Sequence, residues 1–279
     1  MSLRVAGIHR AYADSRYGQL HYRIARPEHV PTRPTLMCLH QSPKSGWDYE
    51  PIMGEMARDR VVIAPDTPGY GGSDAPEAPV DIEDYATVMV SLADDLLAAG
   101  VIPPGPIDVL GYHTGSLICT ELGRSFPGRV RRLCLLGLAA YDEAERRARL
   151  EAIDRFPTPR ADGSNIIALW KLVESLNDPR IDPEWRQLSF AESLRSGRRL
   201  PWGFIAVYRY DFLGNLARLT QPTLVLCPQD DLWENTHKVF PTIPHGRLLE
   251  FPNAAHGFLQ LDRDNVVHAL RSFYDEEDV

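Results

Sequence analysis

The chain has 279 residues, of which 44% are hydrophobic and 24% charged, a composition typical of a globular protein with a large core. Its formal net charge of -8 offers no basic surface that would neutralise phosphates, so we expect no nucleic-acid partner. No apolar run approaches the ~18 residues of a membrane-spanning helix, and the N-terminus lacks the apolar stretch of a secretory signal. We therefore expect a cytoplasmic protein without a membrane partner.

The first elements are expected to be two antiparallel strands joined by a turn at Arg16 to Gly18. After this turn Leu20, Tyr22 and Ile24 alternate with polar residues, which is the pattern of a strand with one solvated face. Short apolar runs without alternation follow, separated by helical segments, and such runs are typical of strands buried on both faces of a parallel sheet. These runs lie at residues 34–40, 60–66, 107–111, 131–138, 222–227 and 246–251. The order predicts an α/β fold with a mainly parallel, doubly wound sheet of about eight strands.

Residues 141–221 separate two of these strands and are too many for a connecting loop in a compact domain. Their helical patches, interrupted by proline and glycine, predict a bundle of about four helices. We therefore predict a core domain formed by residues 1–140 and 222–279, with residues 141–221 inserted as a helical cap.

A predicted strand-turn-helix segment carries Gly111, His113 and Gly115 in the order Gly-Tyr-His-Thr-Gly. This spacing resembles the G-x-S-x-G nucleophile elbow of the α/β-hydrolase superfamily, where glycines flank a turn too tight for larger side chains. The superfamily usually places serine, cysteine or aspartate at the tip, whereas this chain places His113 there. The resemblance covers residues 18–274 and implies the α/β-hydrolase fold.

Asp231 and His256 follow the turn in the chain order that these hydrolases show for the acid and the histidine. The resemblance implies that Asp231 bonds and orients His256 in the active site. Asp230 and Asp142 are the alternative acids, because one neighbours Asp231 and the other follows an apolar strand.

Gln41 and Ser42 end a predicted strand at the place where relatives carry an oxyanion loop. The resemblance implies that the N–H of Gln41 or Ser42 pairs with that of Thr114 around a substrate oxygen. Residues 66–74 resemble the loop that shapes the backbone beside the oxyanion loop.

Aromatic side chains are expected to bind the substrate. The resemblance implies that the cap lies over the elbow, so some of its aromatic residues are expected to face the pocket, while most are expected to form the core of the cap itself. Two more aromatic residues follow the oxyanion loop and are predicted at the entrance. The predicted substrate-binding residues are Trp47, Tyr49, Trp170, Trp202 and Tyr208.

His113 admits three interpretations. As a nucleophile it needs no base, because a pKa near ~6.5 leaves imidazole largely unprotonated at pH ~7. Alternatively, His113 and His256 hold a water molecule, one ring acting as base and the other as acid. In the third interpretation the elbow is a relic in a protein that only binds a ligand. Ser116 is expected to be a first-turn helix residue rather than the nucleophile.

The sequence predicts a hydrolase that cleaves an ester, lactone or other activated carbonyl bond of a small molecule without a cofactor. A cofactor-independent dioxygenase or lyase on the same fold and a non-catalytic binding protein are the alternatives. A metal site is disfavoured, because Asp231 is expected to bond His256 from the far side of the ring. The four cysteines lie in apolar runs without metal-binding spacing and are expected to be buried free thiols.

Overall fold

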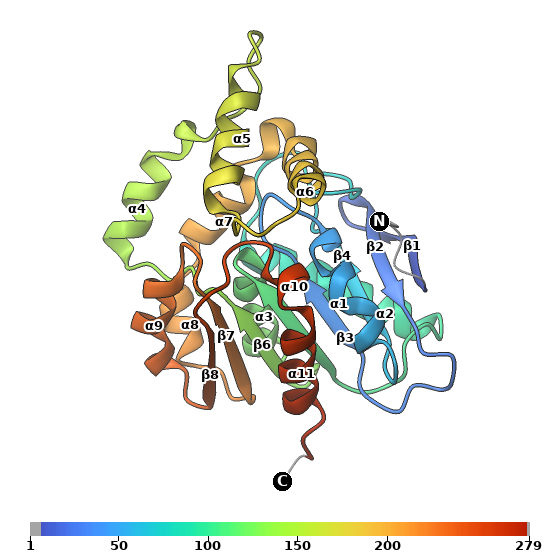
Figure 1. The fold of residues 1–279 in the computed structure, drawn as a ribbon. Helices are drawn as coiled ribbons and strands as arrows, with labels where there is room; N and C mark the ends of the chain where they lie inside the picture. The colour runs from blue at the N-terminus through green and yellow to red at the C-terminus, as the bar shows by residue number, and fades with distance from the viewer. Residues whose placement is uncertain (1–6, 278–279) are drawn as a thin grey trace.

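The computed structural model describes residues 7–277, which form an eight-stranded mixed sheet with helices on both faces (Figure 1). The strand order is β1-β2-β4-β3-β5-β6-β7-β8, with antiparallel pairing of β1 with β2 and of β2 with β4, and parallel pairing elsewhere. The strands are β1 (Ile8–Ser15), β2 (Gly18–Ala25), β3 (Leu36–Leu39), β4 (Val62–Pro65), β5 (Ile107–Tyr112), β6 (Val130–Leu136), β7 (Thr223–Pro228) and β8 (Gly246–Phe251). The predicted α/β-hydrolase fold is confirmed, although the first six and last two residues of the predicted core lie outside the described residues.

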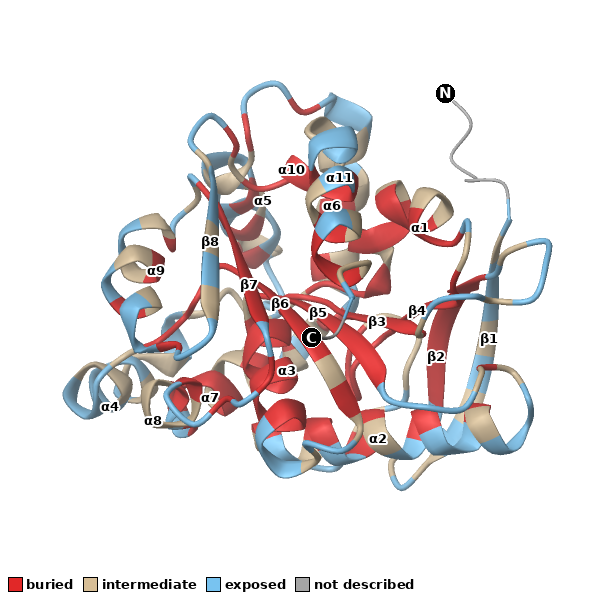
Figure 2. Cartoon of the chain, turned by 90° about the horizontal axis from the view of Figure 1, so that it is seen from below, coloured by how far each residue is buried: buried red, intermediate tan, exposed pale blue. Residues whose placement is uncertain are grey.

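The central strands are buried on both faces, which explains their unalternating apolar sequences. Met37 and Leu39 pack with α2 (Ile82–Ala98) and α3 (Thr114–Ser125) on one side of the sheet. Their neighbours in β3 pack on the other side with α1 (Glu50–Met56) and α11 (Arg263–Tyr274). Figure 2 shows the buried centre of the sheet and the exposed positions on its edge strands, β1 and β8.

Residues 141–221 fold into helices, most of which lie above the sheet in Figure 1, whereas α8 lies lower, level with β7. They are α4 (Glu143–Glu151), α5 (Ser164–Leu176), α6 (Pro183–Arg195), α7 (Trp202–Arg209) and α8 (Phe212–Leu216), with 3₁₀ turns at Ile153–Arg155 and Gly197–Arg199. α7 and α8 contact α3, so the segment is anchored on one core helix. Its status as a separate cap domain remains a prediction.

Short helices complete the chain. They are the 3₁₀ turns Gly46–Tyr49 and Phe240–Thr242 and the helices α9 (Trp233–Val239) and α10 (Phe258–Leu261). Among the described residues, no helix combines the length and the apolar character that crossing a membrane requires. The four cysteines are buried and unpaired, as the sequence predicts.

Asp66, directly after β4, connects the N-terminal hairpin to the loops beside the site. Its carboxylate accepts the backbone N–H groups of Gly46 at 2.8 Å and Gly72 at 2.7 Å. It also contacts Nδ1 of His21 at 2.8 Å and accepts Nη1–H of Arg23 at 3.0 Å. One buried carboxylate therefore holds three segments of the chain together.

Removing the charge of Asp66 tests this connection. Burial raises the pKa of Asp66, but the hydrogen bond to His21 and the charge of Arg23 outweigh burial and hold the pKa at about 2. Because this pKa lies below the unfolded value near ~3.9, the ionised carboxylate stabilises the fold above pH ~4, and this stabilisation is lost as the pH falls toward ~2.

We expect Asp66→Asn to lower the free energy of unfolding at pH ~7 by about 2 kcal/mol and to flatten its decline between pH ~4 and ~2. Urea denaturation followed by circular dichroism at several pH values measures both effects. An identical pH dependence in the variant and the unmodified protein would contradict this assignment.

Candidate active site

His113 lies at the tip of the turn between β5 and α3. Its backbone angles are φ 46° and ψ -107°. Among the described residues, His113 is the one residue other than glycine that has a positive φ. This conformation is strained, so the surrounding structure must impose it. A Cβ added at Gly111 would lie 2.3 Å from the carbonyl oxygen of Gly115, and one at Gly115 would lie 1.8 Å from that of Leu39. These contacts explain why glycine occupies both flanking positions.

The imidazole of His113 is paired with a buried carboxylate. Its Nε2 lies 2.9 Å from Oδ2 of Asp230, whose side chain is 1% exposed. The other oxygen of Asp230 accepts the backbone N–H of Leu232 at 2.9 Å, which fixes the carboxylate. An ionised carboxylate only accepts hydrogen bonds, so Nε2 of His113 carries the proton and the lone pair of the neutral ring is on Nδ1.

His256 forms a second pair of the same kind beside the first. Its Nε2 lies 2.7 Å from Oδ1 of Asp231, and its ring meets that of His113 edge to face with centroids 5.1 Å apart. The structure thus brings His113, Asp231 and His256 together and adds Asp230. Asp142, the other alternative acid, instead caps α4 by accepting the N–H of Glu145.

The carboxylates bias the protonation of the site. Burial lowers the pKa of His113, but the charge and hydrogen bond of Asp230 outweigh it, and with help from Asp231 the pKa lies above its ordinary value. Burial raises the pKa of Asp231, whereas the hydrogen bond from His256 and the charge of His113 hold this pKa well below its usual range. Asp231 therefore stays ionised at neutral pH, and His113 holds a proton more readily than free histidine.

The predicted oxyanion donors lie next to the turn. The N–H of Ser42 donates to Oγ1 of Thr114 at 3.3 Å, so this donor is already engaged. Within residues 7–277, no acceptor contacts the N–H of Gln41, and Thr114 opens α3, where N–H groups lack partners inside the helix. His40 fixes the loop by contacting the carbonyl of Gln41 at 2.7 Å through Nδ1. Gln41 and Thr114 are the N–H groups left for a substrate oxygen.

A cavity of about 110 Å³ opens onto both histidines. The core contributes His113, Asp231, His256, Gln41 and Ser42 to its wall. The opposite wall is mostly apolar and comes from the segment 141–221, with Phe156, Leu169, Leu172, Val173, Leu176, Leu200 and Phe204 beside the polar Asn177 and Ser193. Because an apolar cavity of ~150 Å³ holds benzene, this one suits a small apolar group.

Lys44 joins the oxyanion loop to this wall. Its ammonium donates to the carbonyl oxygen of Ser189 at 2.5 Å and to the hydroxyl of Ser189 at 2.7 Å, both in α6. Burial lowers the pKa of Lys44 to about 8, while the charges of Asp48 and Glu192 act in the opposite direction. Lys44 was not predicted from the sequence, because a lysine in a loop usually lies in solvent.

None of the five aromatic residues predicted to bind the substrate lines this cavity, and their part in substrate binding stays a prediction: Trp47, Tyr49, Trp170, Trp202 and Tyr208. Tyr49 is fully buried, and its hydroxyl donates to the carbonyl of Leu39 at 2.7 Å. The ring of Trp170 packs edge-on against Phe190 at 5.2 Å. These large rings bury their area against other side chains of the protein instead of lining the cavity.

The leucine-rich stripe of α5 is the sequence pattern that could have indicated the cavity wall. Leu169, Leu172, Val173 and Leu176 follow the i, i+3, i+4, i+7 spacing of one helix face.

Ser116 is buried as expected, since its hydroxyl donates to the carbonyls of Gly111 and Leu136 at 2.9 and 3.0 Å.

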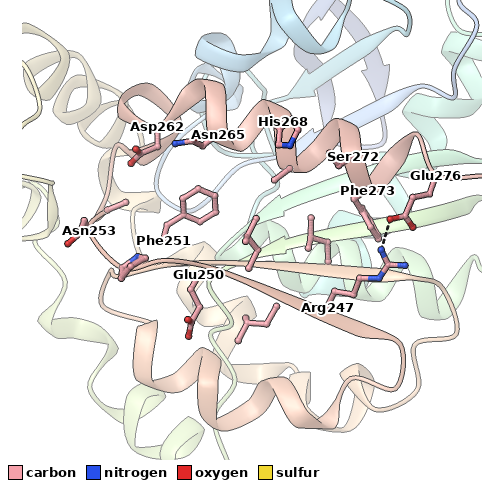
Figure 3. Close-up of a pocket in the computed structure, with 16 residues that line it drawn as sticks. Arg247, Glu250, Phe251, Asn253, Asp262, Asn265, His268, Ser272, Phe273 and Glu276 are labelled. Atoms are coloured by element: carbon pink, nitrogen blue, oxygen red, sulfur yellow. Dashed lines mark hydrogen bonds and ion pairs between the residues drawn. The ribbon is translucent and has the colours of Figure 1, made fainter.

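A larger cavity of about 710 Å³ lies elsewhere, between β8 and α11 (Figure 3). Its wall includes Phe251, His268 and Phe273, and the ion pair of Arg247 with Glu276 borders it. None of the predicted site residues lines this groove. The smaller cavity, which is lined by His113, Asp231 and His256, is therefore the candidate active site.

Comparison with known proteins agrees with the fold. The profile of the alpha/beta hydrolase family matches residues 37–269, and the chain belongs to this family. It is 26% identical over 242 residues to a poly(3-hydroxyalkanoate) depolymerase of Ectopseudomonas oleovorans, covering 81% of this chain and 79% of that protein.

Two solved structures show the same architecture. The enol-lactonase of Burkholderia xenovorans LB400 superposes with a TM-score of 0.77 and 18% identity, covering 95% of this chain and 100% of that one. A thermophilic esterase of Thermogutta terrifontis gives a TM-score of 0.75 and 21% identity, covering 95% and 97%. At these identities the likeness concerns the fold alone.

The pairing of His113 with Asp230 is tested by its titration. We expect Asp230→Asn to lower the pKa of His113, because both a charge and a hydrogen bond are removed. Asp231→Asn is the matched control and is expected to lower it less, because Asp231 acts on His113 through its charge without a hydrogen bond. NMR titration of the histidine ring protons measures both shifts, and equal shifts would refute the pairing.

Proposed function

We propose that this protein hydrolyses an ester or lactone of a small molecule by direct attack of water, with His113 as the general base. The observation that carries the proposal is the buried contact of His113 with Asp230 at the tip of the turn. A carboxylate beside imidazole holds the ring in one tautomer and stabilises the imidazolium that forms when the ring takes a proton. The place usually held by a nucleophile is thus occupied by a base.

In the proposed reaction, Nδ1 of His113 takes a proton from a water molecule as its oxygen bonds to the substrate carbonyl carbon. The N–H groups of Gln41 and Thr114 stabilise the negative charge on the carbonyl oxygen. His256, protonated and held by Asp231, then donates a proton to the leaving oxygen as the bond from carbon to that oxygen breaks. His113 then loses its extra proton and neutral His256 regains one, through exchange with solvent, which restores both rings and completes the cycle.

The spacing of the two rings favours attack by water over attack by His113 itself. Their centroids lie 5.1 Å apart, which leaves both within reach of a single water molecule that bridges them. Both Nε2 atoms are engaged with carboxylates, so each ring presents its other nitrogen for proton transfer. Two paired imidazoles supply the base and the acid that ester hydrolysis requires.

The substrate class follows from the cavity. Its apolar wall and volume of about 110 Å³ suit a short acyl chain or a small ring. We propose that residues 141–221 act as a cap that selects this group. The similarity to a poly(3-hydroxyalkanoate) depolymerase supports a hydrolytic reaction.

The first test removes the base. We expect His113→Asn to lower kcat/KM for a short-chain aryl ester at least about 100-fold, the usual contribution of a general base. Asparagine tolerates positive φ, so the turn and the circular dichroism spectrum are expected to be preserved. His237→Asn, which changes a histidine of α9 paired with Glu250, is the control and should keep full activity. Unchanged hydrolysis in His113→Asn would remove His113 from the reaction.

The second test separates the base from a nucleophile. With protein and aryl ester at comparable concentrations, direct attack by water predicts steady release of the phenol without a burst. Mass spectrometry of the quenched protein should then show no added acyl group. A burst together with acylated protein would show that His113 attacks the carbonyl itself.

A further inference from the structure

The four polar side chains of the site converge on one point. One potential ligand atom from each of His113, Asp230, Asp231 and His256 lies within 4.8 Å of the other three. Two imidazole nitrogens and two carboxylate oxygens are a donor set that zinc and neighbouring divalent ions accept. Ligands about 2.0–2.2 Å from a tetrahedral ion lie roughly 3.4 Å apart, so small side-chain rotations would complete the shell.

We propose that these four side chains bind one Zn²⁺ ion and that the bound ion switches hydrolysis off. Binding is a property of the side chains alone. The loss of activity rests on the proposed function, because it follows from the role given to His113.

The surroundings favour such an ion. The side chains of Asp230, His113 and His256 are 1%, 14% and 11% exposed, so a cation there meets little competition from water. Two carboxylates balance its double charge, which removes the main cost of burying an ion. Asp231 is 48% exposed and borders the cavity, so an ion can reach the site from that side.

The expected inhibition follows from the tautomer of His113. In the metal-free protein Nε2 carries the proton and contacts Asp230, which leaves Nδ1 free to accept a proton from water. An ion bound to Nε2 displaces that proton, and the neutral ring then carries its proton on Nδ1. His113 can no longer act as the base.

The ion is not expected to replace the base. Catalytic zinc sites use three protein ligands and keep one position for water, whereas four protein ligands close a tetrahedral shell. The four side chains here supply a complete shell. The bound ion therefore has no position for the water that it would have to activate.

The binding test uses the untagged full-length protein after metal removal, titrated with Zn²⁺ by calorimetry and with Co²⁺ by visible absorption. We expect one ion per chain and the intense spectrum of tetrahedral Co²⁺. His113→Asn and Asp230→Asn should each weaken binding more than about 100-fold, because loss of an outer partner already costs 10–100-fold. His237→Asn, which removes the contact of His237 with Glu250, is the matched control and should leave binding unchanged. No binding, or equal binding by the site variants, would overturn the proposal.

The activity test adds one equivalent of Zn²⁺ to the metal-free protein and follows aryl-ester hydrolysis. We expect activity to fall in proportion to occupancy and to return with a chelator. A rate that rises with Zn²⁺ would overturn the off-switch. Absence of hydrolysis in the metal-free protein would instead overturn the proposed function, and the calorimetric result would still decide the metal site.

Discussion

The contact between Nε2 of His113 and Oδ2 of Asp230 is the interaction on which the chemistry of this site depends. It holds the ring in one orientation, places the proton on Nε2 and supports a positive charge on the imidazole. A histidine at the same tip without this partner would rotate and titrate like a surface histidine. In the proposed reaction, the buried aspartate is what makes this histidine a base.

The sheet brings these groups together because parallel strands end at the same edge. β5 leads into the turn with His113, and β7 leads into the loop with both aspartates. His256 lies in the segment between β8 and α11, beside this edge. The helices of residues 141–221 then close the space above these loops with apolar side chains. The titratable groups gather on one wall, and the other wall is mostly apolar.

Much of the fold could be predicted because burial on both faces leaves unalternating apolar runs, as in Leu36–Leu39 and Thr223–Pro228. The glycines beside His113 were equally readable, since only glycine fits those contacts. The partner of His113 could not be predicted, because two adjacent aspartates in the sequence give no indication of which side chain turns toward which histidine. That choice depends on the loop after β7, where Asp230 turns inward and Asp231 stays half-exposed.

The residues of the cavity wall could not be predicted from the sequence for a related reason. The stripe of α5 that faces the site has the same helical spacing as a stripe that faces an ordinary core, so only three-dimensional packing separates them. The sequence could not show which aromatic residues line the cavity, because a large ring packs equally well in a core and in a pocket.

The most direct test is a double-mutant cycle on kcat/KM for an aryl ester with His113→Asn, Asp230→Asn and their combination. If Asp230 acts only through His113, the double variant should be no slower than His113→Asn alone, because the two residues work as one unit. Losses that multiply in the double variant would show that Asp230 and His113 act separately and would contradict the account.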